Sequence, residues 1–63
     1  MKPLMICEET INGREFILIC NLTEDYLIPK RIYLKLDLEN RKDVKYLKAC
    51  FVISPHILNA LGL

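Results

Sequence analysis

The chain has 63 residues, with nine Lys or Arg side chains against eight Asp or Glu and a formal net charge of +1. Apolar residues make up 52% and charged residues 27%, a balance that excludes a disordered chain. The length predicts a single domain over residues 1–63. The longest apolar runs, residues 17–20 and 49–53, are far shorter than the roughly 20 residues of a membrane span. We therefore expect a cytoplasmic protein with no membrane contact.

The cysteines bear on how so small a chain is stabilised. A domain of this size buries only about 60% of its unfolded surface, and disulfides, a metal or self-association usually help it. The three cysteines, Cys7, Cys20 and Cys50, form no Cys-x-x-Cys pair, and His56 is the only histidine. Zinc sites need four such ligands, usually in close pairs. The pattern predicts reduced cysteines, no metal and no cofactor, and leaves self-association or docking on a partner.

Asn12 and Gly13 separate two apolar runs, residues 3–11 and 14–20. Both residue types tolerate the positive φ angles of a type I′ turn, so the sequence predicts a β-hairpin. One face of its open end then carries Leu4, Ile6, Ile17 and Ile19, and the other carries Met5, Cys7, Leu18 and Cys20. Strands that are apolar on both faces are buried on both. Because the chain can cover one face with its own helix, the other is predicted to stay open.

The next segment predicts a third strand. Residues 21–25 form a polar connection, and residues 26–29 end in a proline, which fits an edge segment or the start of a strand. From Arg31 onward the side chains alternate between two faces. The apolar face carries Ile32, Leu34, Leu36 and Leu38, and the other carries Tyr33, Lys35 and Asp37.

Residues 40–51 favour a helix, although residues 46–53 also fit a buried strand. In the helix, Asn40 is the N-cap, and Val44, Leu47, Cys50 and Phe51 form an apolar stripe. The far side is basic and carries Arg41, Lys42, Lys45 and Lys48.

Ser54 and Pro55 predict a second short helix over residues 55–61, because Ser is a preferred N-cap and Pro a preferred first helical residue. Gly62 fits its C-terminal end. A helix this short is not stable alone, so its apolar side chains must dock on the sheet or on another chain. The whole pattern predicts an α+β fold: a small antiparallel sheet, made of the hairpin and a third strand, with two C-terminal helices on one face.

Nothing in the sequence indicates catalysis. His56 follows Pro55 at a helix start, where Ser54 is better explained as a cap than as a nucleophile. Glu8 and Glu9 are adjacent in a strand and point to opposite faces, so they cannot act as a carboxylate pair. The sequence therefore predicts no enzyme activity and no catalytic residue.

The leading hypothesis is a small protein-binding module that inhibits or regulates a partner protein and forms a homodimer, since contiguous apolar patches mark interaction sites. The residue usage leans toward Ile, Lys and Asn, as in AT-rich genes of phages and mobile elements. The expected interface residues lie on the open hairpin face and the C-terminal tail: Ile6, Ile17, Ile19, Leu58, Leu61 and Leu63.

The alternative is a small dimeric nucleic-acid-binding regulator. Residues 1–29 hold two basic and five acidic side chains, whereas residues 30–63 hold seven basic and three acidic ones. The basic helix side with Arg41, Lys42, Lys45 and Lys48 would contact the phosphates. A net charge of +1 is low for this function, because phosphate neutralisation supplies most of the affinity.

Overall fold

The computed structural model describes all of residues 1–63 and has four antiparallel strands in the order β1-β2-β3-β4, with three short helices. This architecture confirms the small α+β fold. The elements in chain order are β1 (Met5–Ile11), β2 (Arg14–Cys20), β3 (Asp25–Pro29), α1 (Lys30–Tyr33), α2 (Arg41–Cys50), β4 (Val52–Ile53) and α3 (Pro55–Ala60).

The N-terminal hairpin has the predicted turn and register. Asn12 and Gly13 have φ angles of 51° and 77°, as a type I′ turn requires of its two central residues. Ile11 pairs with Arg14, and the register runs without a break to Met5 opposite Cys20. The two-residue turn thus determines which side chains share each face.

The third strand begins earlier than the alternation predicted. β3 covers Asp25–Pro29, the segment expected only as an edge or a strand start, and it pairs with β2 along its whole length. Residues 30–38, the expected strand, instead form α1 and the turns that follow it. Pro29 ends the ladder, since a proline offers no N–H for it, and the chain turns helical from Lys30.

The alternation over residues 32–38 predicted a strand, but this segment is the end of the short helix α1 followed by turns and irregular backbone. Ile32 lies in the helix, whereas Leu36 lies beyond its end. Both pack against the core, as does Tyr33, which the strand pattern put on the outer face. Leu34, expected among the buried residues, is 71% exposed.

Helix α2 confirms the helical interpretation of residues 40–51. The side chain of Asn40 accepts hydrogen bonds from the main-chain N–H groups of Lys42 at 2.9 Å and Asp43 at 3.4 Å. Leu47 is the helix's one fully buried residue, and Phe51 packs beside it. Directly after the helix, Val52 and Ile53 add the short strand β4 to the edge of β3.

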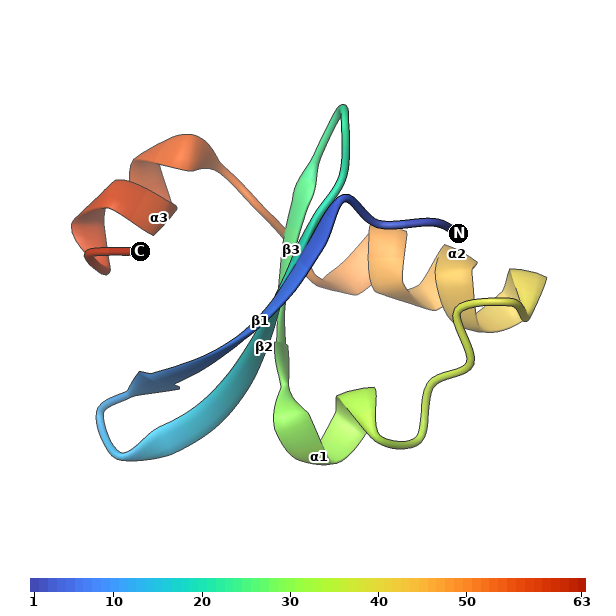
Figure 1. The fold of residues 1–63 in the computed structure, drawn as a ribbon, viewed down its shortest axis with the longest axis horizontal. Coiled ribbons are helices and arrows are strands. Elements are labelled where there is room, and N and C mark those ends of the chain that lie inside the picture. The colour runs from blue at the N-terminus through green and yellow to red at the C-terminus, as the bar shows by residue number, and fades with distance from the viewer.

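Helix α3 begins where Ser54 and Pro55 predicted. The hydroxyl of Ser54 accepts from the N–H of Ile57, and Gly62 has a φ of 78° just after the helix. Its position differs from the expectation of two helices on one sheet face. α1 and α2 lie on one side of the sheet, and α3 lies on the other (Figure 1).

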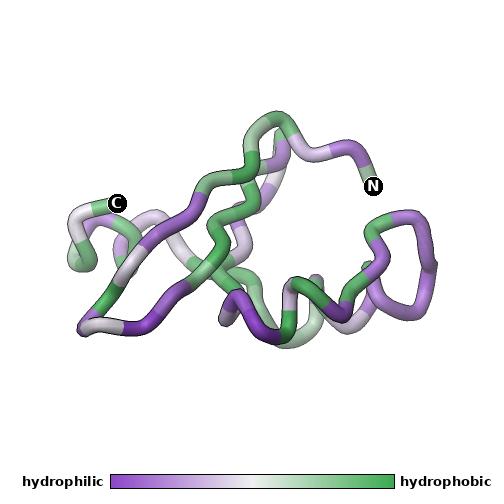
Figure 2. The backbone as a smooth tube through the Cα atoms, turned by 60° about the horizontal axis from the view of Figure 1, so that its bottom comes forward, coloured by the Kyte–Doolittle hydropathy of each residue, from purple (hydrophilic) through white to green (hydrophobic).

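The core lies between the sheet and α2. Its fully packed residues come from the two central strands and the helix: Ile17, Ile19, Tyr26, Ile28 and Leu47. In Figure 2 the apolar stretches gather in the crossing strands, whereas the loop that leads into α2 is hydrophilic. Five of the six buried residues of the chain belong to this layer, so it carries most of the stability.

We predict that Ile17→Lys unfolds the protein. Ile17 is 3% exposed within the core, and an unpaired ammonium there costs more than about 4 kcal/mol, a large part of what a domain this small has. Leu22→Lys is the matched control, since Leu22 is 84% exposed and the change should cost less than about 0.5 kcal/mol. Urea unfolding followed by circular dichroism measures both. A stable, folded Ile17→Lys monomer would remove Ile17 from the core.

Candidate protein-binding surfaces

Strand β1 is an open edge of the sheet, since it pairs only with β2. In a two-residue hairpin the residues flanking the turn, here Ile11 and Arg14, form a hydrogen-bonded pair, and such pairs alternate along the ladder. The N–H and C=O groups of Ile6, Glu8 and Thr10 therefore point away from β2. An unpaired row of this kind is a template for another strand.

Apolar side chains are exposed where this edge begins. Leu4, Met5 and Ile6 are 68%, 50% and 42% exposed, and we call these three residues the edge patch. The main-chain N–H of Leu4 donates to the carbonyl of Cys20 at 2.8 Å, which ties the patch to the sheet end where the exposed Leu22 also lies. The patch is held by the sheet and offers apolar surface beside free backbone groups.

The hairpin residues predicted as an interface separate into two groups. Ile6 is exposed, whereas Ile17 and Ile19 are 3% and 0% exposed and belong to the core. The three share one face, but α1 and α2 cover its centre and leave only its rim to solvent (Figure 1). The sequence identified the faces correctly. It did not show which face the helices would cover, and Ile17 and Ile19 offer no surface to a partner in this fold.

The C-terminal tail is more open. Leu58 and Leu63 are half-buried, Leu61 is 40% exposed and Ile57 is 52% exposed. No residue of α3 belongs to the core cluster. The tail therefore contributes little to the core and retains apolar side chains on its surface.

The basic side of α2 lines a groove of about 330 Å³. Of the predicted basic residues, Arg41, Lys45 and Lys48 line it, and Lys42 does not. The other lining residues are Met1, Leu38, Glu39 and Val44, which sequence reasoning did not assign to a site. The sequence could have shown part of this grouping, because Val44, Lys45 and Lys48 follow Arg41 by three, four and seven residues and therefore share one side of the helix.

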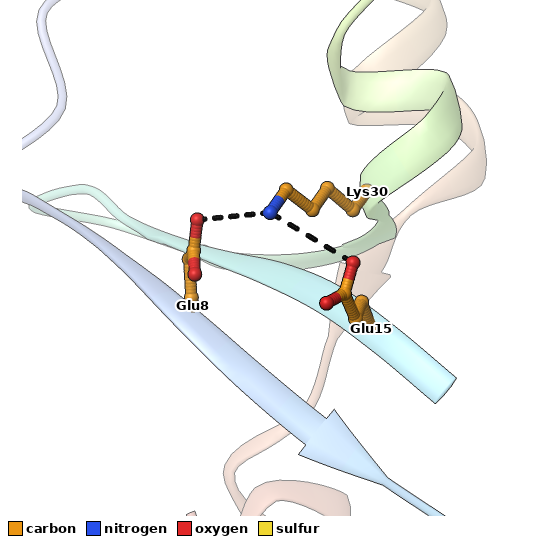
Figure 3. A network of polar contacts seen from close by, with 3 residues as sticks. All are labelled: Glu8, Glu15 and Lys30. Carbon is orange, nitrogen blue, oxygen red and sulfur yellow. Dashed lines mark ion pairs between the residues drawn. The ribbon is translucent and has the colours of Figure 1, made fainter. Parts of the chain in front are cut away.

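Lys30 links α1 to the hairpin (Figure 3). Its Nζ lies 3.2 Å from Glu8 Oε1 and 3.8 Å from Glu15 Oε2. The hydrogen bond with Glu8, then the charges of Glu15 and Glu8, raise the pKa of the Lys30 ammonium. The contact is solvent-exposed, so it contributes more to orienting the helix than to stability.

Two weakly acidic side chains, the half-buried thiol of Cys20 and the buried phenol of Tyr26, lie near carboxylates at the open end of the hairpin. Burial raises the pKa of the Cys20 thiol, and the nearby Asp25 carboxylate raises it further. Burial also raises the pKa of the Tyr26 phenol, which donates a hydrogen bond to Glu24 Oε2 at 3.3 Å. Both groups are held in their neutral, protonated forms.

The three cysteines are free thiols, with Cys7 and Cys20 half-buried and Cys50 exposed. No three His, Cys, Asp or Glu side chains come together in a way that could hold a metal ion. None of the helices has the length and apolar character needed to cross a membrane. No family model, curated protein or solved structure matches the chain.

We predict that stability falls at alkaline pH. Folding raises the pKa values of Cys20, Tyr26 and Lys30, so the folded state retains protons that the unfolded chain releases. The part of the stability that these three groups contribute is fully present below their ordinary pKa values of about 8.5, 10 and 10.4. This contribution is lost as the pH rises past those values.

The measurement is the urea midpoint from about pH 7 to about pH 10.5 with a reductant present. Tyr26→Phe removes one titrating group and should make the fall shallower, whatever its effect at neutral pH. A midpoint that stays level or rises over this range would contradict the assignment.

Proposed function

We propose that this protein is a small protein-binding module that inhibits or regulates a partner protein. The single observation that supports it most is the edge patch: Leu4, Met5 and Ile6 are three consecutive exposed residues where a strand with a free edge begins. Apolar side chains in such a cluster favour contact with another protein over contact with water.

The total surface area supports the proposal. The chain exposes 4729 Å², about 500 Å² more than surface scaling gives for a monomeric protein of 7.4 kDa. A stable interface buries about 800 Å² on each partner. The excess is thus a substantial part of what such an interface would cover.

The geometry favours strand addition as the mode of binding. A partner strand laid along β1 would bond to the outward groups of Ile6, Glu8 and Thr10 and contact the edge patch with its side chains. Glu8 and Glu9 stand at the middle of this edge. Two copies of β1 centred on Glu8 would oppose like charges, which favours a different chain as the partner on this edge.

The proposal also includes self-association, through the apolar side chains on and after α3. α3 has six residues, and Ile57 within it and Leu61 directly after it are both exposed. A helix of this length needs packing to be stable, and a second copy of α3 would supply it. We therefore propose a homodimer through α3, which leaves β1 open to the partner. The residue usage fits an origin in a phage or mobile element.

Nucleic-acid binding is the second candidate, and the groove cations Arg41, Lys45 and Lys48 favour it. None of them takes part in an ion pair, so their charge is available to phosphates. The net charge of +1 disfavours it, and so does a groove lined by no aromatic side chain on which a base could stack. We therefore place protein binding first.

Ile6→Asp should strongly weaken partner capture. Val52→Asp is the matched control, because Ile6, Ile19, Tyr26 and Val52 form one row across the sheet and its two ends are 42% and 50% exposed. The tagged protein is incubated with nuclease-treated lysate of its source cells, and recovered proteins are quantified by mass spectrometry at low and high salt.

A stoichiometric protein that survives high salt should fall about tenfold with Ile6→Asp and change little with Val52→Asp. Equal recovery with both variants would reject the edge patch as the contact. Nucleic acid retained only without nuclease, and lost at high salt, would favour the second candidate.

The homodimer is tested by sedimentation equilibrium. The wild-type chain should sediment as a dimer, and Leu61→Asp should give a folded monomer, because an aspartate would have to be desolvated in the α3 contact. Ile6→Asp should remain a dimer. A wild-type monomer at high concentration would reject self-association and leave the edge patch proposal unchanged.

A further inference from the structure

The groove on α2 combines a charged rim with apolar lining. Arg41, Lys45 and Lys48 stand at i, i+4 and i+7, so they project from one side of a ten-residue helix. At 1.5 Å per residue they span about 10.5 Å along the helix axis. The remaining lining includes the apolar side chains of Met1, Leu38 and Val44.

The groove is held in place by contacts on both of its sides. Met1 and Leu38 pack against the core, and the main-chain nitrogen of Met1 donates to the Leu38 carbonyl oxygen at 2.9 Å. On the helix side, Leu47 anchors α2 to the sheet, and the Asn40 side chain caps its first turn. The backbone on both sides of the groove is therefore held in place by the fold, whereas its charged lining residues, Glu39, Arg41, Lys45 and Lys48, are exposed to solvent.

The charge on the rim is uncompensated. The ion pairs of the protein all involve Lys30, so no carboxylate lies within 4.0 Å of the three groove cations. Glu39 is the only acidic residue that lines the groove. Asp43, the acidic residue in the first turn of α2, is engaged elsewhere, since its Oδ2 accepts from the N–H of Asp37 at 2.9 Å.

We propose that this groove binds an acidic segment of a partner protein that also carries an aliphatic side chain. The carboxylates would pair with Arg41, Lys45 and Lys48, and the aliphatic group would contact Leu38 and Val44. An extended segment of three or four residues covers about 10.5 Å, which matches the span of the cations. Charge complementarity of this kind gives specificity and speeds association.

The lining favours a peptide over a nucleic acid. Phosphates would satisfy the cations, but the bases would meet Met1, Leu38 and Val44, none of which offers an aromatic face for stacking. Tyr46 is on the same helix, but its ring packs edge-on against Phe51 with centroids 5.3 Å apart. An aliphatic side chain is the better complement to this surface.

The inference is separate from the edge patch, because none of Leu4, Met5 and Ile6 lines the groove. Ile6→Asp should therefore bind an acidic peptide as the wild type does. Loss of one site leaves the other measurable, so the two proposals fail independently.

The experiment is a titration of ¹⁵N-labelled protein followed by amide chemical shifts. Three probes are compared: a short peptide with Leu between Glu residues, the same peptide with Gln for each Glu, and an oligothymidylate. The test variant is the double change Lys45→Gln and Lys48→Gln. The control is Lys35→Gln with Lys42→Gln, which removes the same charge from exposed lysines outside the groove.

Saturable shifts at Leu38, Val44 and Lys45 are expected with the Glu peptide. The test variant should weaken binding about tenfold and the control less than about twofold. Equal binding of the Gln peptide, no saturable binding of the Glu peptide, or tighter binding of the oligothymidylate would each overturn the proposal. So would loss of self-association in the test variant, since the occupant would then be the acidic hairpin of a second copy.

Discussion

The packing of Leu47 on the two central strands is the contact on which the rest of this structure depends. Leu47 is fully buried against a sheet face formed by Ile17, Ile19, Tyr26 and Ile28, and α1 completes the cover from the hairpin side. A chain of 63 residues has enough helix for one such layer. Because most of the hydrophobic stabilisation is concentrated there, the other surfaces of the molecule are free to differ from those of a well-covered monomer.

Both proposed binding surfaces follow from this single-layer arrangement. Leu47 of α2 packs in one cluster with Ile19 and Tyr26, the centre of the cross-strand row, and the two ends of this row at Ile6 and Val52 are exposed. The same helix turns its apolar side inward, which forces its basic side into solvent beside Leu38. The edge patch and the groove are therefore two outcomes of one docking event. A change that loosened Leu47 would disturb both together.

The charged side chains are also unevenly distributed, with an acidic hairpin and a basic side on α2. The acidic hairpin is tied to the basic half of the chain by one exposed bridge, from Lys30 to Glu8 and Glu15. The α2 cations remain unpaired, because the fold leaves the acidic strands and the basic helix side without direct contact. This separation suits a protein that presents an apolar edge to one segment and a cationic groove to another.

The sequence by itself determined the features that depend on neighbouring residues. The Asn12-Gly13 turn established the hairpin register, and Asn40 and Ser54 established where two helices begin, since turn and capping preferences act over a few residues. Tertiary structure decided the rest. Residues 32–38 alternate as a strand would, but the ladder ends at Pro29, and the chain continues as α1 and then as turns and irregular backbone. Which apolar hairpin face was covered depended on where α2 docked, because both faces carry apolar side chains and local preferences do not distinguish them.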